Sequence, residues 1–449
     1  VMNICGVDEN GRSVSLKVVN WNLYFYVEIP DIGNDKIKTL YEHIRNMLHY
    51  QRDGLIGYKI HRKKKIFPYF ANNNFLFMKL IFTSKKAFDK YKWLFKNQSK
   101  KQIKPIGFNN CNYKIFDHKI DPINSFCHIN EIESTGWITV KGFKPTHSNA
   151  QINIEATIDC IKPINIQKIA PLTIFSWDIE TLPENKELFP DPTKPNDTIS
   201  QISVVVNKYG TQLFQKIIIT DRPCDPIDDV IVISALSEKE VLIAFCKLFV
   251  LLDPDIITGY NTWSFDDMYL WKRLNRHHIP VTCFTRIPDL NAELKTQGLS
   301  SDAYGSNFFT YINCPGRITF DLIVALRKDE KFDSYTLNAV SEKILGDKKV
   351  DLPIKILFKK LTGSPSDVAE CAVYCVKDSL LVLKIIIKRV MLPTYMEMAK
   401  TTCIPFEWLL FRGQQCRVFS LIAKEARINN FVIPENAGES KIKEKLKVQ

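Results

Sequence analysis

The stretch FSWDIET, residues 175–181, ends an apolar run in two acids that a single isoleucine separates. Successive side chains of an extended strand point to opposite faces of the sheet, so residues two apart share a face. Asp178 and Glu180 would therefore face the same way, with Ile179 turned into the core. Two carboxylates on one face repel each other unless a positive charge lies between them. The pair is either the end of a strand that runs into solvent or part of a metal site.

The segments that follow predict a sheet covered by helices. Three strands are expected, at LTIFSWD (172–178), QISVVVN (201–207) and LFQKIIIT (213–220). Ser237 is followed three residues later by Glu240, which is the capping-box pattern of a helix start, and an apolar stripe at helical spacing comes next. DIITGYN (255–261) then predicts a short strand with a turn at Gly259. Mixed strands with a helical crossover indicate an α/β domain.

Two further acids lie on predicted helices. Ser264 is expected to cap one helix, which puts Asp266 in its first turn, where an acid commonly complements the helix dipole. The mostly apolar segment 366–387 predicts a second helix. Tyr374 and Asp378 are four residues apart and would share one face of it. A surface aspartate is the simpler interpretation of Asp378, but an acid in so apolar a helix must be solvated, paired or bound to metal.

The four acids carry more weight together than singly. Asp178, Glu180, Asp266 and Asp378 supply the oxygen ligands that Mg²⁺ prefers. Two such ions, held close together, can activate a water and stabilise a leaving oxygen during displacement at phosphorus. This chemistry needs several carboxylates and no histidine or cysteine nucleophile. The set therefore indicates metal-assisted phosphodiester hydrolysis.

Composition restricts the possible functions less than the four acids do. The 449 residues are enough for two or three domains. The formal net charge of +12 fits a polyanionic partner such as nucleic acid. The 12 cysteines are scattered, which is typical of reduced cysteines in an intracellular protein, and Cys371 and Cys375 have no second pair that would complete a zinc site. No apolar run reaches membrane-spanning length, so no membrane partner is expected.

Residues 1–165 contain many short runs rich in β-branched and aromatic residues, which predict strands. One helix is expected at TSKKAFDKYKWLFKN (83–97), with Trp93 among the residues of its apolar face. Basic stretches occur at His61–Lys65 and Lys100–Lys104. Each is either a solvated face or a surface that follows phosphates, since aromatic residues lie nearby.

Three motifs resemble the exonuclease motifs of family B DNA polymerases. They are FSWDIET, ITGYNTWSFD (257–266) and YCVKD (374–378), the last in the tyrosine form of the four-acid exonucleases. Three longer blocks resemble cellular δ-type and large-DNA-virus replicative polymerases: 304–326, 333–346 and 411–426. The resemblance is specific over about residues 166–435 and general before them.

The resemblance implies a role for each acid. Asp178 and Glu180 would bind metal, with Asp178 bridging two Mg²⁺ or Mn²⁺ ions. Asp266 would complete the shell of the more exposed ion, and Asp378 would hold the other.

It also implies roles for uncharged neighbours. Tyr374 would orient the attacking water by a hydrogen bond. Asn261 and Phe265 match positions that line the single-strand cleft and contact DNA. Asp321 recurs in the family as well, and we interpret it as structural.

The implied architecture has three parts. An N-terminal domain of mixed small barrels (1–165), mostly β, would precede a ribonuclease-H-like 3′–5′ exonuclease domain (166–395), and a helical segment (396–449) would lead to a palm domain. The SLYP-type and Asp-Thr-Asp motifs of the polymerising half do not occur in this sequence. We therefore expect the front portion of a replicative polymerase, which does not extend a primer by itself.

The expected partners are a single-stranded 3′ end, primer-template DNA and a processivity factor, in the nucleus or at a cytoplasmic site of viral replication. Two alternatives stay open at this point. One is a stand-alone 3′–5′ exonuclease of repair or RNA processing. The other is a non-catalytic nucleic-acid-binding module that kept the fold.

Overall fold

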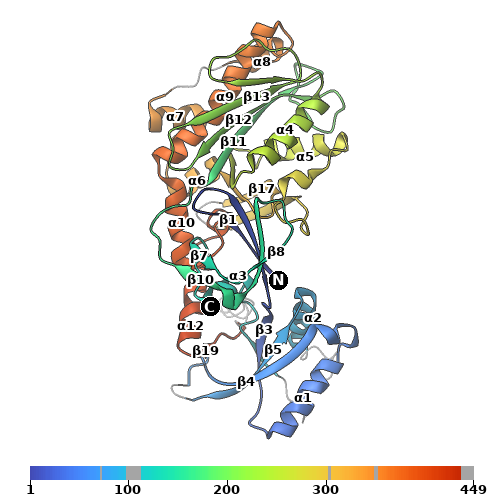
Figure 1. Cartoon of the computed structure of the whole chain (residues 1–449), viewed down its shortest axis with the longest axis vertical. Coiled ribbons are helices and arrows are strands. Elements are labelled where there is room, and N and C mark those ends of the chain that lie inside the picture. Colours follow the sequence, from blue (N-terminus) through green and yellow to red (C-terminus); the bar gives the residue numbers. More distant parts are fainter. Residues whose placement is uncertain (71–72, 98–112, 302–304, 348–351, 436–449) are drawn as a thin grey trace, which may run out of the picture.

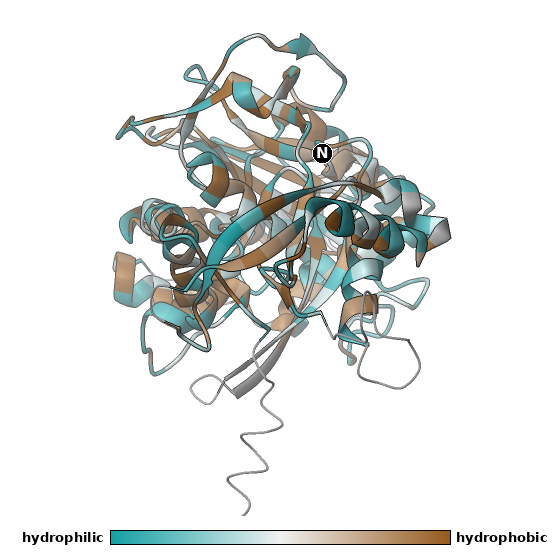
Figure 2. Ribbon diagram, turned by 90° about the horizontal axis from the view of Figure 1, so that it is seen from below, coloured by the Kyte–Doolittle hydropathy of each residue, from teal (hydrophilic) through white to brown (hydrophobic). Residues whose placement is uncertain are grey.

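The computed structural model describes the chain apart from residues 71–72, 98–112, 302–304, 348–351 and 436–449. The molecule is elongated, with a larger α/β portion at one end of its long axis and a smaller portion at the other (Figure 1). Viewed along that axis, hydrophobic segments lie mostly in the packed elements and hydrophilic segments mostly in the outer loops (Figure 2). None of the described helices combines the length and the hydrophobicity that crossing a membrane requires.

A six-stranded sheet forms the core of the larger portion, in the order β14-β13-β12-β11-β15-β18. Its strands are β11 (Thr173–Leu182), β12 (Thr198–Lys208), β13 (Phe214–Thr220), β14 (Ile231–Ser234), β15 (Ile256–Gly259) and β18 (Ile318–Asp321). β11, β12 and β13 pair antiparallel, whereas β14, β15 and β18 join by parallel pairing. The sheet is therefore mixed, as the sequence predicts.

Helices cover both faces of this sheet. α4 (Glu238–Leu252) and α5 (Asp266–Arg276) pack on one face, and α9 (Pro365–Lys388) packs on the other. Strand β11 shows the division, because Trp177 and Ile179 join the hydrophobic cluster of α4 and α5, while Ile174 joins the cluster of α9. The even-numbered residues of β11, Asp178 and Glu180 among them, therefore face α9.

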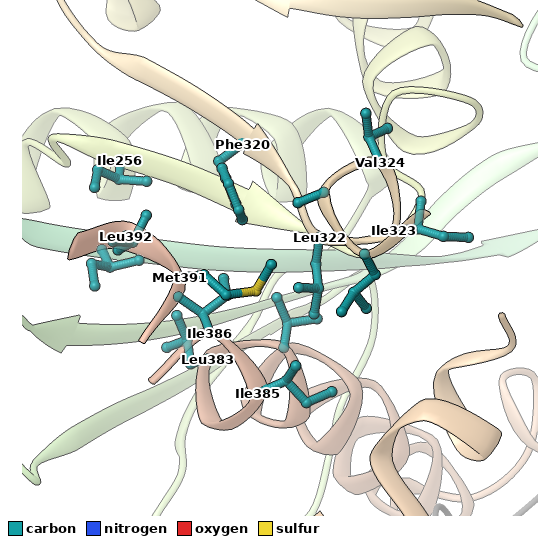
Figure 3. Packing of buried hydrophobic residues seen from close by; sticks show 14 of the residues in the cluster. Ile256, Phe320, Leu322, Ile323, Val324, Leu383, Ile385, Ile386, Met391 and Leu392 are labelled. Atoms are coloured by element: carbon teal, nitrogen blue, oxygen red, sulfur yellow. The ribbon is translucent and has the colours of Figure 1, made fainter. Parts of the chain in front are cut away.

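Shorter helices complete the larger portion. They are α6 (Leu322–Asp329), α7 (Leu337–Leu345) and α8 (Ile354–Lys360), followed beyond α9 by α10 (Met391–Thr402) and α11 (Trp408–Phe411). The next helix, α12 (Gln415–Ile428), lies beside the smaller portion, where Ser420 is 3.2 Å from the ring of His128 (Figure 1). A hairpin of β16 (Glu293–Ser301) and β17 (Gly305–Asn313) precedes β18. Figure 3 shows Phe320 of β18 and Leu322 of α6 beside Leu383 and Ile386 of α9 and Met391 of α10. This packing fixes the position of α6 relative to α9.

The two predicted helix starts have different outcomes. Ser237 caps α4 by accepting a hydrogen bond from the Glu240 N–H at 3.4 Å, which confirms the prediction. The Glu240 carboxylate accepts from the N–H of Leu236 at 2.7 Å. The predicted cap at Ser264 is wrong, because Phe265 occupies the N-cap position of α5 and no side chain caps the helix. Asp266 still lies in the first turn, as predicted.

The described residues of the smaller portion form three sheets. Their strands are β1 (Met2–Val7), β2 (Ser13–Val19), β9 (Ile152–Thr157) and β8 (Lys144–Pro145); β4 (Leu55–Lys65), β5 (Phe75–Phe82), β3 (Leu23–Glu28) and β6 (Ile115–Phe116); and β7 (Trp137–Val140) with β10 (Ile161–Ile164). Strand β19 (Phe431–Val432), from near the other end of the chain, extends the second sheet by pairing with β4. Helices α1 (Asn34–Asn46) and α2 (Lys85–Lys96) cover one face of the sheet that contains β3, β4 and β5. Helix α3 (Pro122–Asn130) packs against β2 and β9. The domain limits at residues 165 and 395 stay predictions.

Helix α2 lies where the sequence predicts it but turns a different face inward. Phe88, Tyr91 and Phe95 are buried, whereas Trp93 is 55% exposed and Leu94 takes its expected place in the core. The prediction for Trp93 is therefore wrong. The basic stretch 100–104 lies outside the described residues.

Candidate active site

The acid pair of β11 lies on one face of the strand, as its spacing predicts. A carboxylate oxygen of Asp178, a carboxylate oxygen of Glu180 and the sulfur of Cys375 all lie within 4.8 Å of one another. Glu180 is buried and Asp178 is half-buried, while Ile179 between them is in the hydrophobic core. The register of β11 against β12 shifts between Glu180 and Thr181, so the pair lies at an irregularity of the strand. Irregularities of this kind often occur next to active sites.

Cys375 of α9 is the residue of this cluster that the sequence analysis treats as an ordinary reduced cysteine. Burial raises the pKa of its thiol well above the usual range, and the charges of Asp178 and Glu180 add to the rise. The thiol is therefore protonated and donates to Oδ2 of Asp178, with an S–O distance of 3.6 Å. The Ser203 hydroxyl of β12 donates to the backbone oxygen of Cys375 at 2.9 Å, which holds α9 against the sheet.

The loop after β15 carries the second motif. A Cβ on Gly259 would lie 2.8 Å from the backbone oxygen of Trp177, so the turn predicted there requires glycine. Asn261 follows with a φ of 65°, in the left-handed region. The carboxylate of Asp321 accepts hydrogen bonds from the N–H groups of Asn261 at 3.1 Å and Trp263 at 3.0 Å. Asp321 thus positions this loop.

Asp321 also caps α6, since its carboxylate accepts from the N–H of Ile323 at 3.0 Å. The side chain is fully buried, and this burial raises its pKa to about 6 although the backbone N–H groups lower it. One buried carboxylate therefore fixes both the second-motif loop and the direction of α6. These contacts agree with its structural interpretation.

Asp266 contacts the backbone of β11 between the two acids of the pair. It is the first residue of α5, and its carboxylate accepts a hydrogen bond from the N–H of Ile179, the residue between Asp178 and Glu180. Burial raises the pKa of Asp266 well above its usual range, and the neighbouring carboxylates of Asp267 and Asp321 add to this effect. A carboxylate in such surroundings is stabilised in its charged form by a cation.

A cleft of about 350 Å³ opens beside the cluster. Asp178 and Asp378 lie on it together with Asn261 of the second-motif loop. Its other lining residues come from that loop, from α6 and from the segment that enters α7: Tyr260, Ile323, Arg327, Tyr335, Thr336 and Leu337. The volume is in the range of pockets that hold small ligands. Three of the predicted site residues therefore meet at one cleft.

Tyr374 and Phe265 are not among the described residues that line this cleft. Tyr374 is one turn before Asp378 on the same face of α9, as predicted. The ring of Phe265 packs against Phe189 and Tyr269, with centroid distances of 5.5 and 5.4 Å. The roles of these two residues stay predictions.

Arg327 and Tyr335 are cleft residues that the sequence analysis misses. The guanidinium of Arg327 lies 5.6 Å from the centre of the Tyr335 ring. The Tyr260 hydroxyl donates to the backbone oxygen of Tyr335 at 2.6 Å, which ties the second-motif loop to the segment before α7. The block 333–346 stands out in the sequence only by its resemblance, and nothing in its composition predicts a cleft wall.

Comparisons with known proteins show which family this chain resembles. Residues 113–340 match the family model described as "DNA polymerase family B, exonuclease domain". The DNA polymerase delta catalytic subunit of Candida albicans is 32% identical over 97% of this chain and 41% of its own length. A DNA polymerase of Paramecium bursaria Chlorella virus NY2A is 31% identical over 72% of this chain and 37% of its own length.

A solved structure shares the fold. The family B DNA polymerase of Pyrobaculum calidifontis superposes with a TM-score of 0.68 at 15% identity, over 96% of this chain and 48% of that one. The match confirms the expected α/β architecture, whose exonuclease domain is ribonuclease-H-like in this family. The chain spans about two fifths of the length of the curated relatives. On the match of residues 113–340 to its exonuclease domain, the chain belongs to DNA polymerase family B.

Proposed function

We propose that this chain carries the 3′–5′ proofreading exonuclease of a replicative DNA polymerase and removes 3′-terminal nucleotides from DNA. The observation that carries the proposal is that Asp178 clusters with Glu180 on β11 and lines one cleft with Asp378 of α9. Asp266 of α5 accepts a hydrogen bond from the backbone N–H of Ile179, between the two β11 acids, and we infer that it completes the set. The names of the relatives support a polymerase rather than a stand-alone exonuclease. Primer-template DNA and a processivity factor are the partners we expect of the whole protein.

The donor set fits divalent ions. Carboxylate oxygens are the ligands of Mg²⁺ and Mn²⁺, and the buried Asp266 lies among other carboxylates whose charges a cation would offset. Asp178, Glu180, Asp266 and Asp378 would hold two ions, with Asp178 shared between them. When bound, such ions activate water and stabilise the leaving oxygen of a phosphodiester.

The chain's own groups then bind and orient the strand. The amide of Asn261 lies on the cleft and can hydrogen-bond the terminal nucleotide. The hydroxyl of Tyr374 would orient the attacking water, one helical turn from Asp378. The thiol of Cys375 holds the Asp178 carboxylate in place through its 3.6 Å contact. Phe265 would contact the single strand where it leaves the cleft.

A nuclease assay with the purified chain tests the proposal. A 5′-labelled single strand incubated with Mg²⁺ should shorten stepwise from its 3′ end and release nucleoside monophosphates. A chelator should abolish the reaction. Internal cleavage, or shortening that persists in the chelator, would contradict the proposed function.

Arg327 should act in binding the strand. Its guanidinium lies on the cleft wall, and among the residues that the structure describes no carboxylate pairs with it. Replacement by glutamine should raise KM for a single strand by roughly 10-fold, as expected for one lost charge-assisted hydrogen bond, and leave kcat nearly unchanged. Steady-state kinetics measures both. Arg276→Gln, at the end of α5, is the matched control; a fall in kcat with unchanged KM for Arg327→Gln would contradict the assignment.

Cys375 should affect the metal requirement. Cys375→Ala removes the donor to Asp178, and loss of such an outer contact weakens metal binding by roughly 10-fold or more. Cys375→Ser keeps a donor and should lie closer to the wild type. The measurement is the Mn²⁺ concentration that gives half the maximal exonuclease rate. Equal values for all three proteins would show that the thiol only fills space.

A further inference from the structure

The second sheet of the smaller portion has a face opposite α1 and α2. Residues of α12 and of the segments around Asp117 and Phe431 pack on the part of this face that holds Tyr24 and Tyr26. Helices α1 and α2 pack on Phe25, Val27, Met78 and Leu80 of β3 and β5. Side chains alternate along a strand, so their sequence neighbours point to the opposite face. That face carries Tyr24 and Tyr26 of β3, Phe75, Phe77 and Lys79 of β5, and Lys59, His61, Lys63 and Lys65 of β4.

Three lysines on this face lie close together. Lys59 of β4 is the direct cross-strand partner of Lys79 on β5, and Lys63 lies two residues beyond His61 on β4. Like charges directly opposite each other in a sheet are destabilising. The ammonium of Lys79 lies 3.8 Å from the centre of the Tyr24 ring, and that of Lys63 lies 5.3 Å from the centre of the Tyr26 ring. Lys63 and Lys79 are thus held on the face by the aromatic residues beneath them, and the ammonium of Lys63 also donates to Oδ1 of Asn430 at 3.1 Å.

The acids near Lys59, Lys63 and Lys79 do not balance the positive charge of these lysines. Lys65, on the same face, pairs with Glu28 at 2.5 Å, but among the described residues no carboxylate lies within ion-pair distance of Lys59, Lys63 or Lys79. Asp117 is the acid that acts on Lys63 and Lys79, and Arg427 adds a further positive charge.

Two observations show the effect of the closely spaced positive charges. Burial, together with the charges of Lys59 and Lys63, lowers the pKa of Lys79 to about 8. The Nε2 atom of His61, between Lys59 and Lys63 on β4, is buried without a hydrogen-bond partner in the described part of the chain. Both features fit a half-buried face that carries an excess of positive charge.

We propose that Lys59, Lys63 and Lys79 form a second nucleic-acid site, which binds the phosphates of a single strand. Lys59 and Lys63 are four strand residues apart, or about 13 Å, a span that accommodates successive phosphates of an extended strand. The proposal concerns binding at the smaller portion and does not depend on the exonuclease cleft.

Exposed aromatic residues favour a single strand as the occupant. Phe67 and Tyr69, just beyond the end of β4, are 69% and 67% exposed. Tyr69 lies beside Phe431, with a centroid distance of 6.5 Å, and the ammonium of Lys64 lies 5.7 Å from the centre of the Phe431 ring. Unpaired bases stack on such rings, and the neighbouring cations follow the backbone.

The test measures binding of a fluorescent oligothymidylate of 30 nucleotides to the full chain in a chelator, over a series of salt concentrations. Lys59→Gln/Lys79→Gln should weaken binding several-fold at low salt and reduce the slope of log Kd against log salt by about 1.4, since each lost phosphate contact on a single strand contributes about 0.7. Lys36→Gln/Lys38→Gln on α1 changes the charge equally and should leave both quantities unchanged.

Two further variants separate the proposal from loss of fold. Lys59→Arg/Lys79→Arg keeps both charges and should restore affinity and slope. Phe67→Ala/Tyr69→Ala should weaken binding without changing the slope. Equal slopes for the glutamine variant and the α1 control would overturn the site. Competition by polyglutamate that equals competition by unlabelled single strand would also overturn it. Duplex DNA that binds as tightly as the single strand would overturn the assigned occupant.

Discussion

Exonuclease activity should fall by about 10³-fold or more when Asp178 is replaced by alanine, at least the loss seen on removing one group that stabilises a transition state. Asp178 belongs both to the cluster with Glu180 and Cys375 and to the lining of the cleft. It lies within 4.8 Å of Glu180 and Cys375, and it lines the cleft with Asp378. Its loss would remove one of the proposed metal ligands. The measurement is the single-turnover rate on a 5′-labelled single strand.

The matched control is Asp289→Ala, at an exposed aspartate in the same portion of the chain. This variant should retain the wild-type rate. Asp378→Ala should resemble Asp178→Ala, because it removes a carboxylate from the same cleft. Rates within a few-fold of wild type for both cleft variants would rule out these acids as the catalytic set.

Asp321→Ala should lower the free energy of unfolding by about 3 kcal/mol or more, because it leaves three N–H groups, of two buried residues and one half-buried residue, without their acceptor. Those groups belong to Asn261, Trp263 and Ile323. The second-motif loop and the start of α6 should loosen together. Hydrogen exchange of the Asn261 and Trp263 amides would report this directly, and Asp333→Ala at an exposed position is the control. Unchanged protection of both amides would contradict the positioning role.

The same residue predicts a dependence of stability on pH. The pKa of Asp321 is raised from 3.8 to about 6 in the folded chain, so the folded state holds this proton more tightly than the unfolded state. Its stabilising contribution is complete below pH 3.8 and is lost as the pH rises through 6. The loss amounts to about 3 kcal/mol, at 1.36 kcal/mol per pKa unit. Urea titrations in metal-free buffer between pH 4 and 7 should show this slope for the wild type and a smaller one for Asp321→Asn.

The local geometry of the site could be predicted from the sequence. The two-residue period of a strand puts Asp178 and Glu180 on one face, and the four-residue spacing in a helix puts Tyr374 and Asp378 on one face. Their meeting required the fold, because β11 and α9 are far apart in the chain and come together through the pairing of β12 with β11 and the Ser203 contact to α9. Resemblance to a family supplied the expectation that these faces meet.

Other features could not be predicted in this way. Arg327 reaches the cleft because Asp321 sets the direction of α6, and no local pattern expresses that. Ser264 fails as a cap because the hydrogen bonds from Asn261 and Trp263 to Asp321 fix the loop so that α5 begins one residue later. Trp93 is two residues from Tyr91, which puts it off the face that Phe88 and Phe95 share.

Helix α1 could not be predicted for a different reason. The buried face of α1 consists of four apolar residues at helical spacing: Ile37, Leu40, Tyr41 and Ile44. The segments around α1 are rich in strand-forming residues, so this spacing does not stand out in the sequence.

Calorimetric titration with Mn²⁺ tests the convergence of the four acids most directly. The wild-type chain should bind two ions, and Asp178→Ala should lose most of this binding while Asp289→Ala keeps it. Titration curves that are the same for wild type and Asp178→Ala would contradict the account.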